Sequence, residues 1–99
     1  MDQNKVLLQQ GVAKLLSTMR CKTGWTQKLM GLKLDFSESY ISLLESQKKP
    51  ASLTVLFNIC KLFKLTMSEL MLYLDVYAME KRPSVIESIT ERLVERLDH

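Results

Sequence analysis

Apolar residues recur at helical spacing along most of the chain. From about Lys5 to Cys21 they return every three or four positions, which is the period of one face of an α-helix. The pattern predicts a first amphipathic helix that ends before Gly24. Its inward positions are Val6, Leu7, Val12, Leu15, Leu16 and Met19.

Two much shorter runs follow, separated by only a few residues. Thr26 is a suitable N-cap for a helix that continues through Leu34, and Ser37 for a helix over Glu38–Ser46. In the first run the predicted inward positions are Leu29, Met30 and Leu34, and in the second they are Ile41 and Leu44. The second run opens with polar residues and an aromatic one, which is unusual for a helix that only packs.

Three more helices are predicted in the second half. A fourth helix starts at Ser52 or Thr54, with a stripe of Leu53, Leu56, Ile59, Cys60 and Phe63. A fifth, from about Met67 to Met79 after a cap at Thr66 or Ser68, is apolar nearly all round, which favours burial on more than one side. A sixth covers Ser84–Leu97, with a stripe of Ile86, Ile89, Leu93 and Leu97. The fold class is therefore all-α.

The sixth helix is too short to be stable alone, so it docks either on its own chain or on a second subunit. We expect residues 1–82 to form one domain and residues 83–99 a helical extension used for dimerisation or docking. The predicted dimer interface joins the fifth and sixth helices through Leu70, Leu74, Tyr77, Ile86, Ile89 and Leu93.

Charge is distributed unevenly along the chain. Twelve basic and seven acidic residues precede Ser84, whereas two basic and four acidic residues follow from there. A basic body suits a phosphate-bearing partner. Cys21 and Cys60 lack metal-ligand spacing, and a single histidine with no glycine-rich phosphate loop leaves no catalytic constellation. We expect no enzyme activity, metal or cofactor, no membrane span, and a cytoplasmic location.

The two short runs meet the physical demands of a helix-turn-helix motif. A helix in the DNA major groove needs polar side chains in its first turn and an apolar inner face, and the run that begins at Glu38 has both. The helix before it needs a small residue where the two cross, which Gly31 supplies. Asp35 stands at the turn, where a left-handed backbone is needed.

Residues Arg20 to Leu70 resemble the DNA-binding domain of Cro/cI-type (XRE-like) transcriptional regulators. The resemblance rests on four segments in this order: "RCKTGWTQ", "FSESYISLLES", "KKPASLTVLFNICKLFKL" and "TMSEL". It implies a five-helix, lambda-repressor-like domain whose third helix reads DNA. The chain departs from the family pattern at Asp35 and Gln47, where glycine is usual, and at Glu38, an unusual acid beside DNA.

The resemblance also implies residue roles. Base contacts are expected from Glu38, Ser39, Tyr40, Ser42 and Leu43. Phosphate contacts are expected from Thr26, Gln27, Lys28, Lys48, Lys49, Ser52 and Thr54, with Gln27 also bracing the recognition helix. Arg20 would pair with Glu45 and tie the first helix to the third.

Several alternatives stay open at this point. Glu38 can accept a hydrogen bond from the cytosine amino group, or it can repel phosphate. The Tyr40 ring can pack on Phe36, or its hydroxyl can reach the groove. Trp25, just before a helix cap, is more typical of a core staple than of base stacking.

The function expected from these features is a homodimeric repressor that binds an inverted-repeat operator in double-stranded DNA. The alternative is a protein-interaction module, such as an antitoxin or adaptor, that acts through the fifth and sixth helices on a regulatory protein partner.

Overall fold

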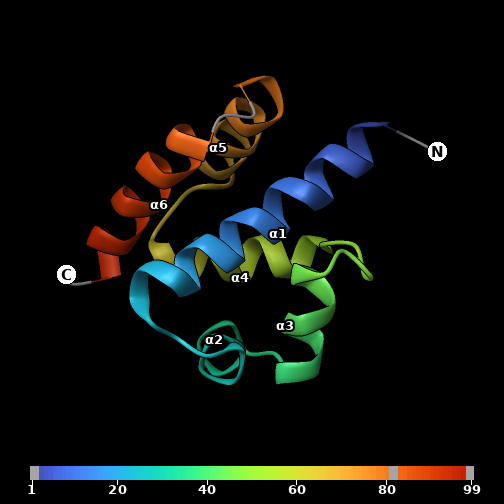
Figure 1. The fold of residues 1–99 in the computed structure, drawn as a ribbon, viewed down its shortest axis with the longest axis vertical. Coiled ribbons are helices and arrows are strands. Elements are labelled where there is room, and N and C mark those ends of the chain that lie inside the picture. The colour runs from blue at the N-terminus through green and yellow to red at the C-terminus, as the bar shows by residue number, and fades with distance from the viewer. Residues whose placement is uncertain (1–2, 81–82, 98–99) are drawn as a thin grey trace.

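A computed structural model describes residues 3–80 and 83–97, and the side-chain surroundings of residues 8–76 and 87–97. In these residues the chain forms six α-helices and no strand, as the all-α prediction required. The helices are α1 Gln3–Thr23, α2 Gln27–Leu34, α3 Glu38–Glu45, α4 Leu53–Phe63, α5 Met67–Glu80 and α6 Pro83–Leu97. Figure 1 shows α1 running through the middle of the molecule, with α2 and α3 on one side and α5 and α6 on the other.

Local capping chemistry sets the helix starts. The hydroxyls of Thr26, Ser37 and Ser52 accept hydrogen bonds from backbone N–H groups three residues later, at 3.0, 3.1 and 3.3 Å. At the start of α5, the Glu69 N–H donates to the Thr66 hydroxyl, and the Thr66 N–H donates to the Glu69 carboxylate, each at 3.1 Å. This reciprocal capping box shows that Thr66, and not Ser68, caps α5, and the Ser52 hydroxyl shows that Ser52, and not Thr54, caps α4.

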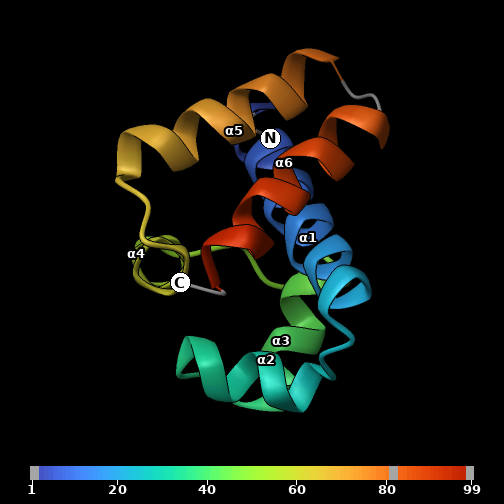
Figure 2. The ribbon, with the colours of Figure 1, turned by 90° about the vertical axis from the view of Figure 1, so that its left-hand side faces the viewer.

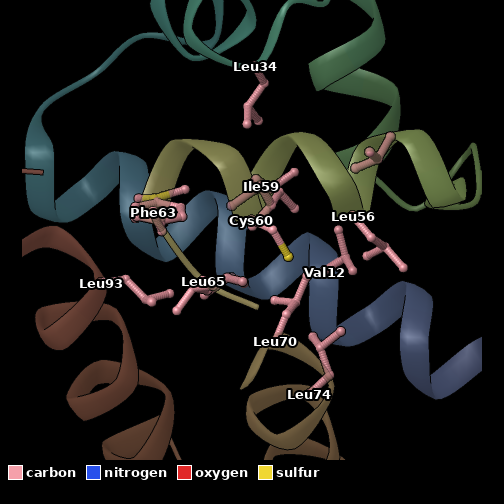
Figure 3. Packing of buried hydrophobic residues seen from close by; sticks show 14 of the residues in the cluster. Val12, Leu34, Leu56, Ile59, Cys60, Phe63, Leu65, Leu70, Leu74 and Leu93 are labelled. Atoms are coloured by element: carbon pink, nitrogen blue, oxygen red, sulfur yellow. The ribbon is translucent and has the colours of Figure 1, made fainter. Parts of the chain in front are cut away.

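A single hydrophobic core holds the helices together, and α4 lies at its centre. Figure 3 shows Ile59 and Phe63 of α4 among Val12 from α1, Leu34 from α2, Leu70 from α5 and Leu93 from α6. All six side chains are almost completely shielded from solvent. Helices α2 and α3, which form the predicted DNA-binding motif, therefore share one core with the C-terminal helix α6.

The C-terminal helix docks on its own chain, which was one of the two alternatives. Figure 2 shows α6 crossing in front of α1, with α5 toward the top of the view, and α6 packs against α1. Four of the six residues predicted at a dimer interface, Leu70, Leu74, Ile89 and Leu93, are buried in the chain's own core. Within one chain these four side chains are covered, and the dimer contact predicted through them stays a prediction. The side chains of Tyr77 and Ile86 lie outside the described residues.

Polar contacts also join α6 to the body. Lys22 of α1 forms an ion pair with Glu91 at 3.2 Å, and Arg96 forms one with Glu69 at 3.3 Å. Arg96 donates a second hydrogen bond to the carbonyl of Lys64, at 3.2 Å. The four ion-pair side chains are between 32% and 61% exposed, so the two pairs add little to stability.

Two inward predictions were wrong. Leu29 is 38% exposed because α2 turns Met30, Gly31 and Leu34 toward the body. Leu53 is 60% exposed because it is the first residue of α4, whose buried face begins at Val55. In α5, Met71 and Leu72 face solvent, so a single chain does not enclose this helix on all sides. No helix in residues 3–80 and 83–97 is long and apolar enough to cross a membrane.

Candidate nucleic-acid interface

Helix α2 packs so closely against the turn that leads into α3 that only glycine fits at the contact. A Cβ atom on Gly31 would lie 2.5 Å from the carbonyl oxygen of Phe36 and 3.2 Å from the carbonyl carbon of Ser37. These are backbone atoms of the turn, which a rotamer change cannot move. The Gly31 carbonyl also accepts hydrogen bonds from the N–H groups of Asp35 and Phe36. Gly31 thus fixes the angle between the two helices, as the sequence predicted.

The turn itself is built on Asp35. Its φ of 68° is in the left-handed region, where aspartate is tolerated better than most residues. The preceding carbonyl, that of Leu34, accepts a hydrogen bond from the Asn58 side chain at 2.8 Å. Nothing in the sequence pattern pointed to Asn58, because an amide on a helix surface carries no signal of its distant partner.

Helix α3 presents a polar face from a firmly held backbone. Ile41 and Leu44 are buried, whereas Glu38, Ser39 and Ser42 are exposed. The sequence pattern predicted this division between inner and outer faces. Because the exposed side chains occupy the first turn and a half of an eight-residue helix, they form a compact polar tip.

Two of the predicted base-contact residues lie at the edge of that tip. Tyr40 and Leu43 are half-buried. The Tyr40 ring packs on Phe36 with centroids 4.9 Å apart, and the Lys49 ammonium lies 5.8 Å from the Tyr40 centroid. The ring is therefore in the packed arrangement, one of the two that the sequence left open. Trp25 likewise packs against the core.

An ion pair ties α3 to α1, as the resemblance implied. Arg20 Nε and Nη2 donate to the two carboxylate oxygens of Glu45 at 2.7 and 2.8 Å. A third guanidinium hydrogen bond reaches the carbonyl of Trp25 at 3.3 Å. The hydrogen bond to Glu45 raises the pKa of Arg20. Gln27 Nε2 of α2 donates a long hydrogen bond of 3.5 Å to Glu45 of α3. The contact by which Gln27 was predicted to brace α3 is therefore present.

The predicted phosphate contacts fall on two sides of α3. On one side, the N-terminal ends of α2 and α3 frame a shallow depression of about 640 Å³ lined by Arg20, Thr26, Gln27, Lys28 and Glu38. Free amides and the helix dipole favour an anion at such an end. On the other side are the exposed residues Lys48, Lys49, Ser52 and Thr54. The hydroxyl oxygen of Ser52 accepts the capping hydrogen bond of α4, which leaves the hydroxyl proton available for donation to a phosphate.

A hydrogen bond from α1 helps to hold the basic loop that follows α3. Gln47 has a φ of 63°, and its carbonyl accepts a hydrogen bond from the Gln9 side chain at 2.7 Å. The N–H groups of Lys48 and Lys49 both donate to the Leu43 carbonyl, at 2.9 and 3.3 Å. Gln9 was not singled out from the sequence, and neither was the left-handed Lys64 that ends α4.

Cysteine and metal chemistry adds nothing to this interface. Cys21 and Cys60 are both free thiols. Burial raises the pKa of Cys60, which makes its thiol a poor nucleophile. Within the described part of the chain, no cluster of three or more His, Cys, Asp or Glu side chains could hold a metal ion.

Comparison with known proteins gives one match. A family model described as helix-turn-helix matches residues 16–70, which run from the second half of α1 into the start of α5. No curated protein and no solved structure matches the chain.

Proposed function

Because the chain belongs to the helix-turn-helix family of Cro/cI-type, XRE-like transcriptional regulators, which bind DNA, we propose that it is a homodimeric repressor of an inverted-repeat operator. The family is one of DNA-binding regulators rather than of enzymes. The observation that carries the proposal is the exposed polar tip of α3 on a buried apolar base. That tip has the size and chemistry to enter the major groove.

Residue roles follow from exposure. The exposed Glu38, Ser39 and Ser42 contact base edges, and Tyr40 and Leu43 touch the groove at the margin of the tip. Phosphates of one strand bind at Thr26, Gln27 and Lys28, where the amides of α2 begin. Phosphates on the far side of the groove bind at the loop of Lys48 and Lys49 and the start of α4, at Ser52 and Thr54.

Dimerisation supplies the specificity that one helix lacks. A single recognition helix reads a few base pairs, each worth ~1–3 kcal/mol of discrimination, which is too little among genomic competitors. A two-fold dimer would read two half-sites about one helical turn apart. Among the described residues outside α2, the exposed large apolar side chains available for this contact are Leu53 and Phe57 on α4 and Met71 and Leu72 on α5.

The test is selection of bound duplexes from a random DNA pool, with the mass of the protein in solution measured in parallel. The proposal expects an enriched inverted repeat and a dimer mass. A monomer mass, or a single half-site, would remove the dimer from the proposal. The absence of any enriched sequence would remove the operator.

Two variants distinguish the recognition of bases from the contacts to phosphates. Ser39→Ala should relax base preference at one position of each half-site. Lys49→Ala should weaken all DNA nearly equally and lower the slope of log affinity against log salt by about 1. If neither variant changes DNA binding, α3 is not the reading helix.

Glu38 has two roles that one variant distinguishes. If its carboxylate accepts from a cytosine amino group, Glu38→Gln should reduce the preference for cytosine at one position. If it repels phosphate instead, Glu38→Gln should raise affinity for every duplex by a similar factor. Repeating the selection with this variant decides between them.

A second candidate function is a protein-interaction module. It is favoured by the exposed apolar side chains, among which Leu32 and Leu72 are 72% and 60% exposed. Salt separates the two candidates, because phosphate neutralisation makes DNA affinity fall steeply with salt whereas apolar docking is nearly insensitive to it.

A further inference from the structure

A half-open cavity of about 440 Å³ lies between α2 and α6, at the C-terminal end of α4. Its size falls within the ~300–1,000 Å³ range of small-molecule sites. Its apolar wall comes from Trp25, Leu62, Val94 and Leu97. The cavity therefore offers an aromatic ring and branched aliphatic side chains to a ligand of modest size.

The polar part of the lining consists of three cationic side chains and the neutral Thr23. Lys33, Lys64 and Arg96 line the cavity, and none of the described lining residues is acidic. Arg96 is partly neutralised by Glu69, at 3.3 Å. Lys33 has no ion pair with any residue that the structure describes, and its ammonium lies 4.6 Å from the centroid of the Trp25 ring. A cation over an aromatic face beside an apolar wall is suited to a negative group attached to an apolar body.

The cavity does not overlap the DNA-facing surface. Lys33 is two positions from Gly31, or about 200° around α2, so it lies opposite the contact with α3. The depression at the N-terminal ends of α2 and α3 shares no lining residue with this cavity. A ligand here and DNA at α3 can be bound at the same time.

We propose that this cavity binds a small organic anion, with a carboxylate or phosphate at Lys33 and an aromatic or aliphatic body against Trp25 and Leu62. Such a ligand contacts α2 and α6 together. It therefore links the helix-turn-helix unit to the C-terminal helix from the side away from DNA.

Trp25 provides a direct readout, because it is the chain's one tryptophan. The full chain is titrated with phenylacetate, phenyl phosphate and the uncharged benzyl alcohol, without DNA, while tryptophan fluorescence is recorded. The proposal expects saturable changes with at least one anion, at an affinity about fivefold or more above that of benzyl alcohol. Whichever anion binds more tightly identifies the headgroup.

A matched pair of variants tests the position of the anion. Lys33→Gln should weaken anion binding about fivefold, whereas Lys14→Gln, the same charge change at an exposed site on α1 outside the lining, should not. Circular dichroism melts check that both variants fold. No saturable change, equal binding of benzyl alcohol, or equal weakening by both variants would overturn the proposal. None of these outcomes depends on whether the chain binds an operator.

Discussion

Helices α3 and α6 are both short and amphipathic, and both pack against α1, yet they are held in different ways. Helix α3 is fixed by Gly31 at its crossing with α2, by the Ser37 cap and by a bidentate ion pair whose Glu45 side chain is 8% exposed. Helix α6 is held by Ile89 and Leu93 in the core, with exposed ion pairs around them.

The difference lies in the polar contacts. Each helix buries two large apolar side chains, Ile41 and Leu44 in α3 and Ile89 and Leu93 in α6. In α3 a shielded, bidentate ion pair adds a directional contact, whereas the ion pairs of α6 are exposed and add little. The variants below test this contrast, from the largest expected effect to the smallest.

Removing the apolar anchor of α6 should have the largest effect. Leu93 is fully buried, and Leu93→Ala should lower the free energy of unfolding by about 2–5 kcal/mol, as large-to-small core changes do. Urea denaturation measures this, with Glu95→Ala at an exposed position of the same helix as the control. A loss below about 1 kcal/mol would mean that α6 is not an integral part of the core.

Breaking the polar anchor of α3 should come next. Arg20→Ala leaves the Glu45 carboxylate shielded and unpaired, which should cost about 1.5–3 kcal/mol of stability and reduce DNA affinity. The double variant Arg20→Met with Glu45→Leu removes both charges and should recover much of the stability. If the double variant loses as much as the single one, the ion pair is not what positions α3.

Gly31→Ala tests the close crossing. The added methyl should push the turn away and cost about 1–3 kcal/mol, offset by about 1 kcal/mol of better helix propensity. Because α3 must move, the substitution should change the free energy of DNA binding by more than it changes the free energy of unfolding. Leu32→Ala, at an exposed neighbouring position, is the control for both measurements. An unchanged DNA affinity would contradict the role assigned to Gly31.

The smallest effect is expected at Glu69, which lies in the first turn of α5 and pairs with Arg96 near the C-terminal end of α6. The Thr66 N–H, followed by Arg96, lowers the pKa of Glu69 from its ordinary 4.5. A lowered pKa in the folded state gives stability that is present above about pH 4.5 and is lost as the pH falls through the folded value. Glu69→Gln should therefore flatten the pH dependence of stability in that acid range, measured by thermal melts. An unchanged profile would show that this contact contributes nothing.

Features set by neighbouring residues could be predicted from the sequence. The caps at Thr26 and Ser37 and the turn at Asp35 depend on local chemistry, and all three are present. The pair of Arg20 and Glu45, distant in sequence, came from the family resemblance.

Features set by the three-dimensional arrangement could not be predicted. Hydrophobicity alone placed Leu29 and Leu53 inside, but the close α2–α3 crossing and the position at the start of α4 leave them exposed. An apolar stripe such as that of Leu93 does not reveal whether its own chain or a second one covers it. Polar side chains that bind distant backbone carbonyls, such as Gln9, follow no periodic pattern.

The shared core has a consequence for cooperativity. Leu93 of α6 and Leu34 of α2 lie in the same buried cluster, so we expect the C-terminal helix to unfold together with the body and not separately. Opening α6 exposes core residues on which the helix-turn-helix also rests. The buried amides of α6 and α4 should then exchange with deuterium only through global unfolding, at closely similar rates.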